Sequence, residues 1–284
     1  VNGRYPINTL INIFLLSLVA GLGTGLGGLL AVIRKPGRRS FGFLMGMTAG
    51  VMISLSFMEL VAEAWALKGF WTATIGFAAG AFFMLALDMA LPHIRFGEEE
   101  RPGLNASTVH VDEPPYARPG KHRRGRVRHA NQITNRPLYM SGILLALGIT
   151  IHNLPEGIAV GAGYMHTPKF GIFIAIAILL HNIPEGIATA LPLCKSGVCR
   201  WDSFKVAFFS GLVEPIGALI AALFLNVFSN MIPGALAFAG GVMMFITLDE
   251  LIPTAREYGH QHYTALGIIF GSIFVFLLSG FFGV

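Results

Sequence analysis

Eight long apolar stretches constrain the fold of this chain more than any other feature. Each is close to the roughly 20 residues that a helix needs to cross a bilayer. Charged residues make up only 12% of the chain, whereas about 25% is usual in soluble domains. We therefore predict an all-α, polytopic membrane protein with eight transmembrane helices. The predicted spans are 9–33, 41–66, 71–94, 138–165, 170–193, 203–229, 233–255 and 262–283.

Lysine and arginine are distributed unequally between the two sides of these spans. The connections after spans 1, 3, 5 and 7 carry seventeen of the 20, and the other side carries Arg4, Lys68 and Lys169. Positive charge accumulates on the cytoplasmic side of membrane proteins. We therefore expect both termini outside the cytoplasm, and we predict a location in the plasma membrane, which is the inner membrane in a bacterium.

We predict a single transmembrane domain, residues 1–284, with one long polar insertion. Residues 95–137 carry 14 of the 35 charged residues, and 121–128 form a basic cluster. This composition is typical of a disordered loop, which the spans place in the cytoplasm between the third and fourth of them. Its role as a topology determinant accounts for the net charge of +5, so the expected partner is the lipid bilayer and not nucleic acid.

Eight acidic residues lie inside the predicted spans, whereas no lysine or arginine lies within the body of a span. A carboxylate in a membrane has to be paired, bound to a metal or protonated. Because the spans supply no cation, the counter-charge has to come from solution, as a metal ion or a proton. A single carboxylate often does no more than bond a neighbouring helix, and this alternative stays open for Glu63 and Asp88.

The pattern His-Asn-x-Pro-Glu-Gly occurs twice, at 152–157 and 181–186; we call these the two motif copies. The histidine and the glutamate of each copy are four residues apart, so they share one face of a helix. Each proline frees a backbone carbonyl, which favours an unwound helix that lines a cavity. A mixed nitrogen and oxygen set suits zinc, iron, manganese or cobalt better than calcium. The predicted metal ligands are His152, Asn153, Glu156, His181, Asn182 and Glu185.

Further residues extend this predicted site. Glu214 precedes a proline in span 6, and in span 2 Met52 shares a helical stripe with two glutamates. Span 7 repeats the stripe from Met243, for which packing is the default interpretation. We predict Glu214 and Met52 as additional ligands. The residues predicted to line an ion pathway are Glu59, Glu63, Asp249 and Glu250.

The spans form two similar sets. Residues 50–60 align with 241–251 at an offset of 191, and glycines of span 3 match glycines of span 8 at the same offset. Span 1 aligns with span 6, and span 4 with span 5. Because the matched spans cross the membrane in opposite directions, we predict an inverted repeat of spans 1–3 and 6–8 around the pair 4–5. Such repeats are typical of secondary transporters.

With these motifs the chain resembles the ZIP (Zrt/Irt-like) divalent metal transporters, in particular their bacterial, GufA-like branch. The resemblance covers nearly the whole chain. It implies a homodimer, an elevator-like movement of spans 1, 4, 5 and 6, and one or two metal ions midway across. It also implies two ligand sets: His152, Glu156 and Glu185 with Met52 as a candidate fourth ligand, and Asn153, Asn182 and Glu214 with both glutamates of the motif copies bridging.

We therefore predict a transporter, not an enzyme, that carries zinc as its substrate into the cytoplasm. Iron, manganese and cadmium stay open because such sites overlap in their ligands. One alternative is an intramembrane zinc metalloenzyme, although the HExxH pattern is absent. The other is a proton-coupled carrier of a different solute, which would ordinarily need a cationic residue or a polar pocket in the spans.

Overall fold

The computed structural model describes residues 7–34, 36–90 and 136–284. Those parts contain helices and no strands, so the all-α prediction is confirmed. The predicted loop at 95–137 falls almost entirely outside the described residues. The helices are α1 (Ile7–Ile33), α2 (Arg38–Ser54), η1 (Leu55–Val61), α3 (Ala62–Ala90), α4 (Arg136–His166), α5 (Pro168–Lys195), α6 (Arg200–Gly211), α7 (Glu214–Val227), η2 (Ser229–Met231), α8 (Ile232–Ile246), η3 (Thr247–Leu251), α9 (Ile252–Tyr258) and α10 (Gln261–Phe282).

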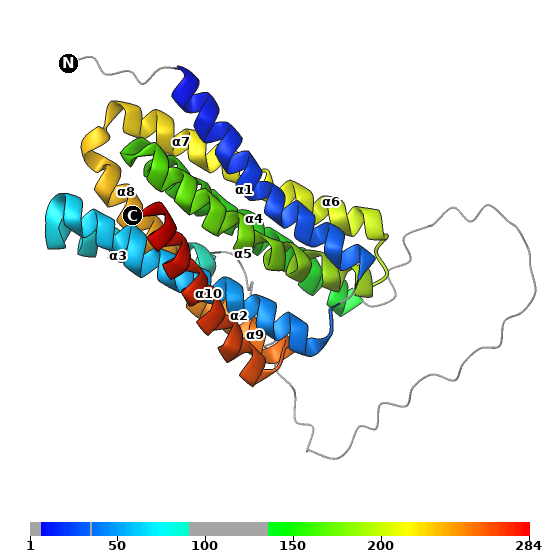
Figure 1. Cartoon of the computed structure of the whole chain (residues 1–284). Coiled ribbons are helices and arrows are strands. Elements are labelled where there is room, and N and C mark those ends of the chain that lie inside the picture. Colours follow the sequence, from blue (N-terminus) through cyan, green and yellow to red (C-terminus); the bar gives the residue numbers. More distant parts are fainter. Residues whose placement is uncertain (1–6, 35, 91–135) are drawn as a thin grey trace, which may run out of the picture.

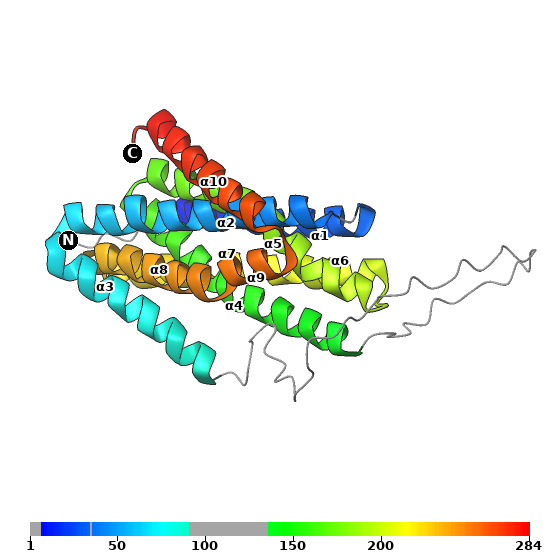
Figure 2. The same ribbon diagram turned by 90° about the horizontal axis from the view of Figure 1, so that it is seen from below.

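Within the described residues, 7 helical stretches are long and apolar enough to cross a membrane. The longest runs for 53 residues from Arg38 to Ala90. It contains Gly69 with φ 82°, a conformation that glycine adopts without strain. The chain folds back in this region (Figure 2), so this one stretch supplies two segments of different direction. The count is therefore compatible with the eight predicted spans.

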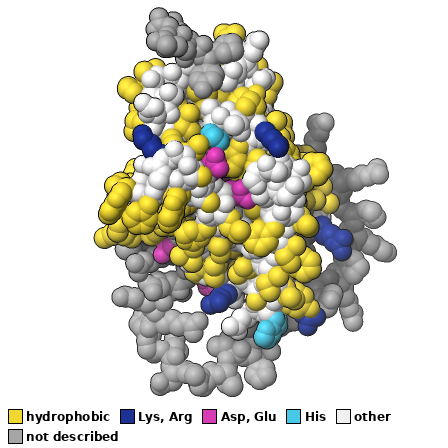
Figure 3. Space-filling view, turned by 60° about the vertical axis from the view of Figure 1, so that its left-hand side comes forward, with side chains coloured by type: hydrophobic (Ala, Val, Ile, Leu, Met, Phe, Trp, Pro, Cys, Tyr) yellow, Lys and Arg dark blue, Asp and Glu magenta, His cyan; other side chains and the backbone are white. Residues whose placement is uncertain are grey.

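The helices form two groups that lie side by side (Figure 1). The first, which we call the motif bundle, consists of α1, α4, α5, α6 and α7. The second, the flanking bundle, consists of α2, α3, α8, α9 and α10. The groups meet mainly where α4 packs on α8 and α2 packs on α5. Large hydrophobic side chains cover much of the outer surface (Figure 3), as lipid contact requires.

The closest helix contacts of the flanking bundle occur in matched pairs. A Cβ atom at Gly50 would collide with the carbonyl oxygen of Ile268, and one at Gly241 with that of Phe77. Gly50 and Gly241 are 191 residues apart, and so are Phe77 and Ile268. Each helix pair can approach this closely only because no side chain intervenes. The two contacts are therefore separated by the same offset as the sequence match.

The helix interruptions differ from those predicted. Pro155 and Pro184 lie inside α4 and α5, which continue through them, so the expectation of unwound backbone at the motif copies was wrong. The break lies instead between α6 and α7, at residues 212–213. Two other segments, η1 and η3, are π-helical at positions that the predicted repeat would match. π-helical turns of this kind are frequent at functional sites.

Candidate metal centre

Three side chains from the two motif copies form a compact buried cluster. Glu156 belongs to α4, and His181 and Glu185 belong to α5. One ligand atom from each lies within 4.8 Å of the others. His181 Nε2 is 3.0 Å from Glu156 Oε1. Because α4 and α5 pack against each other, Glu156 of the first motif copy meets His181 of the second.

The carboxylates of this cluster have acceptor capacity that the described residues leave unused. Neither oxygen of Glu185 has a hydrogen-bond partner there, and neither does Glu156 Oε2. Burying a carboxylate without a partner is costly, so these oxygens favour a cation among them. Two carboxylates beside one imidazole supply the oxygen and nitrogen donors that suit a divalent transition metal.

The asparagines of the motif copies are held by their amide nitrogens. Asn153 Nδ2 donates to the Ser210 carbonyl at 2.8 Å, next to the break between α6 and α7. Asn182 Nδ2 donates to the Ala20 carbonyl at 3.1 Å and to Glu214 Oε2 at 2.9 Å. Across the described part of the chain, the Oδ1 atom of each asparagine and Glu214 Oε1 have no hydrogen-bond partner. These three oxygens are further buried acceptors available to an ion.

His152, also a predicted ligand, makes its contact outside the compact cluster. Its Nε2 atom lies 2.9 Å from Glu250 Oε2 of η3. Glu250 is 12% exposed, whereas His152 is almost fully buried. A predicted ligand of the motif bundle and a predicted pathway residue of the flanking bundle are therefore in direct contact. The compact cluster itself contains His181 where the resemblance implied His152.

The other predicted pathway residues lie apart from the cluster. Glu63 Oε1 lies 2.8 Å from His166 Nε2 at the end of α4, and both side chains are half-buried. Glu59 is buried in η1, and Asp249 is an exposed neighbour of Glu250 in η3. The structure therefore does not gather these carboxylates into one site, although Glu63 and Glu250 each contact a histidine of α4.

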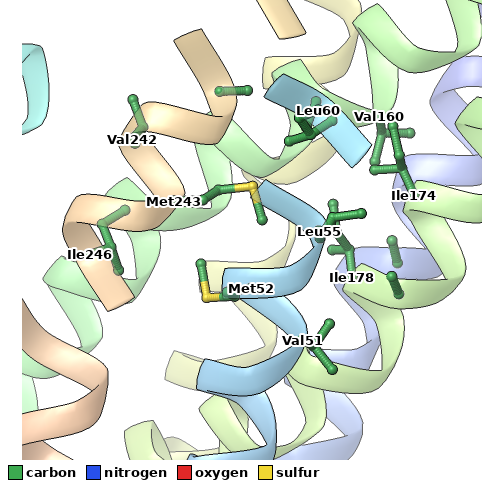
Figure 4. Packing of buried hydrophobic residues seen from close by; sticks show 14 of the residues in the cluster. Val51, Met52, Leu55, Leu60, Val160, Ile174, Ile178, Val242, Met243 and Ile246 are labelled. Carbon is green, nitrogen blue, oxygen red and sulfur yellow. The ribbon is translucent and has the colours of Figure 1, made fainter. Parts of the chain in front are cut away.

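Met52 is fully buried in the apolar core. It lies with Met243 in the space between α2 and α8 (Figure 4). These two methionines are 191 residues apart, so they are equivalent positions of the predicted repeat. For both residues the observed environment is the packing that was the default interpretation of Met243.

Two residues of this region were missed by the sequence analysis. Thr48 Oγ1 donates to the His181 carbonyl at 3.1 Å and so ties α2 to the helix that carries the second motif copy. Thr48 lies four residues before Met52, on the stripe already noted, and this spacing was an available signal. His166, the partner of Glu63, lies at the end of a span and is separated from the motif, so no spacing pattern indicated it.

Residues 94–279 match the family described as ZIP Zinc transporter. The chain belongs to this family. This ZIP protein is 36% identical to zinc transporter ZupT of Clostridium perfringens over 96% of both chains. It is 37% identical to zinc transporter ZTP29 of Arabidopsis thaliana, over 90% of this chain and 89% of that one. Zinc transporter ZupT of Oceanobacillus iheyensis is also 37% identical, over 91% and 93%.

Family membership settles two of the predictions. The ZIP protein is an integral membrane protein, in agreement with its long apolar helices. It is a transporter and not an enzyme, as predicted, so the metalloenzyme alternative is set aside.

Proposed function

We propose that this ZIP protein transports zinc into the cytoplasm through the site between its motif copies. The observation that carries the proposal is the cluster of Glu156, His181 and Glu185, in which buried carboxylate oxygens lack protein partners among the described residues. The similar proteins from bacteria and a plant are named zinc transporters. The inward direction is part of the proposal.

The site holds two ions in this proposal. The first is bound by Glu156, His181 and Glu185, and His152 joins them when it leaves Glu250. The second is bound by the free amide oxygens of Asn153 and Asn182 and by Glu214, with Glu156 and Glu185 bridging. Met52 packs in the apolar core beside Met243, so the first ion is bound by nitrogen and oxygen atoms in this proposal. Since these donors replace the hydration shell but must also release the ion, their affinity has to be moderate.

The contact between His152 and Glu250 lies on the proposed way out of the site. Glu250 is partly exposed and has one oxygen without a partner among the described residues. An ion that reaches His152 therefore meets a carboxylate that leads on to Asp249. Glu63 and Glu59 belong to the opposite end of the pathway.

Iron, manganese and cadmium are further candidate substrates because they accept the same donors.

The proposal includes the orientation and the assembly of the protein. The distribution of lysine and arginine supports termini outside the cytoplasm of a plasma or bacterial inner membrane. The matched contacts of Gly50 and Gly241 support an inverted repeat of spans 1–3 and 6–8. A homodimer follows from the resemblance to the family. Movement of the motif bundle against the flanking bundle would open the site alternately to each side.

Transport of zinc but not of calcium is the direct test of this function. Proteoliposomes containing the purified protein should take up zinc with saturable kinetics, because imidazole and carboxylate donors together suit transition metals. Calcium prefers oxygen ligands alone and is expected to enter no faster than in empty liposomes. Radioactive zinc and calcium provide the measurement. Zinc uptake equal to that of empty liposomes would overturn the proposed function.

Replacing Glu214 by glutamine is expected to abolish binding of the second ion and to preserve binding of the first. Glu214 is fully buried and contacts Asn182 but no residue of the compact cluster by hydrogen bond among those described. The wild-type protein should bind two zinc ions and Glu214→Gln one, measured by titration calorimetry of purified protein in detergent. The exposed Glu257→Gln should still bind two. Binding of a single ion by the wild type would rule out the two-ion site.

A further inference from the structure

An apolar groove opens between the two bundles on the outside of the protein. Its volume is about 530 Å³, within the range of sites that hold small molecules. One wall comes from α3 and α8 of the flanking bundle, and the other from α7 and α4 of the motif bundle. The lining includes Trp71, Ile75, Ala79, Phe224, Ala235 and Ile158. Since this surface faces the membrane, its natural solvent is hydrocarbon.

The groove has the direction and depth that an acyl chain requires. Trp71 and Ala79 both line it and are eight residues apart on α3, which is about 12 Å along a helix. A hydrocarbon core is about 30 Å thick, so a groove that begins at the interface approaches the midplane. Trp71 is 72% exposed and its ring contacts Phe70. Exposed tryptophan is typical of the membrane interface, so Trp71 marks the outer end.

The ammonium group of Lys68 lies at this outer end of the groove. Lys68 Nζ donates to the Asn230 carbonyl at 2.8 Å, and the next residue, Met231, lines the groove. Lys68 is exposed, and an ammonium group has three donors. The hydrogen bond to Asn230 fixes the ammonium group beside the groove and leaves donors for an anion. A phospholipid has an anionic phosphate next to its acyl chains. Its phosphate would lie at Lys68 while an acyl chain lies in the adjoining groove.

We propose that this groove binds one phospholipid of the bilayer, with an acyl chain along Ile75 and Ala79 and the phosphate at Lys68. The lipid would contact both bundles, because Ile158 of α4 and Ala235 of α8 lie on different walls. Ile158 follows the ligand Glu156 by two residues. The occupant therefore touches the helix that carries the first motif copy, although its binding does not depend on any metal.

Native mass spectrometry of the full chain in detergent, with palmitoyl-oleoyl-phosphatidylglycerol added, tests the site. The wild type should retain one lipid per chain, and Ala79→Phe should lose it because the ring fills the groove. Ala265→Phe is the matched control, since Ala265 is an exposed alanine of α10 that does not line the groove. Lys68→Gln should weaken binding about fivefold, as expected for one cation near a lipid surface. Melting temperatures of the variants confirm that they fold.

Two results of this experiment would overturn the proposal. Equal lipid retention by the wild type, Ala79→Phe and Ala265→Phe would mean that only the general lipid layer is observed. Loss of a dimer, without loss of lipid, in Ala79→Phe would mean that a second copy covers the groove. If Ala79→Phe does not fold, Ala235→Leu takes its place in the test. This substitution narrows the groove from the wall formed by α8 and should also abolish lipid binding. Because no zinc is added, failure of zinc transport would leave these results unaffected.

Discussion

Replacing Glu185 by glutamine is expected to lower zinc uptake by at least about 100-fold and to leave the protein folded. Both carboxylate oxygens of Glu185 are fully buried and have no hydrogen-bond partner among the described residues. The substitution removes a buried charge that forms no hydrogen bond in the described part of the chain, so the fold loses little. The proposed site loses a bridging ligand. Loss of a group that only hydrogen-bonds a metal ligand already costs about 10–100-fold in metal affinity or activity, so loss of the ligand itself should cost at least as much. Uptake of radioactive zinc into proteoliposomes measures the effect.

The control for this prediction is the same substitution, glutamate to glutamine, at a position far from the proposed site. Glu257 is exposed on α9, and the side chain takes no part in the proposed pathway. Glu257→Gln should transport zinc at the wild-type rate, and both variants should melt at the wild-type temperature in detergent. Retention of more than about a tenth of the uptake by folded Glu185→Gln would remove Glu185 from the proposed set of essential ligands.

The bundle of helices and the polar face of each motif copy were predictable because both depend on local rules. Span length follows from bilayer thickness, and the spacing of His181 and Glu185 follows from the helical repeat. Their union with Glu156 in one cluster was suggested by the duplication, because two equivalent helices place equivalent faces together. The spans and the motif spacing depend on residues close together in the sequence, and the cluster depends on the duplication of one short motif.

What could not be predicted depends on contacts between the bundles. The stripe from Met52 to Glu63 assumed α-helical spacing throughout, whereas η1 is π-helical and rotates the later residues. Glu63, which follows this segment, contacts His166, whereas Met52, which precedes it, packs in the apolar core. The contact of His152 with Glu250 likewise joins two spans that are nearly 100 residues apart. No local pattern fixes such a pair, because it is set by how one bundle packs on the other.

Replacing Gly186 by alanine is expected to destabilise the protein by about 3 kcal/mol or more, the upper end of overpacking costs. A Cβ atom at Gly186 would collide with the carbonyl oxygen of Thr24 in α1. The obstacle is backbone, which cannot move aside as a flexible side chain could. Gly157, the equivalent residue of the first motif copy, meets the Glu214 carbonyl in the same way. The melting temperature in detergent and the yield of folded protein measure the loss.

Gly280→Ala is the control because it adds the same methyl group to a helix in open space. Gly280 lies in α10, and no heavy atom lies within 4 Å of the position of its Cβ. Alanine favours a helix over glycine, so this variant should be as stable as the wild type or more so. Gly186 and Gly157 directly follow the glutamates of the compact cluster. Their small size lets α1 and α7 approach the ligands, so stability of Gly186→Ala equal to that of Gly280→Ala would mean that this close approach is not needed to build the site.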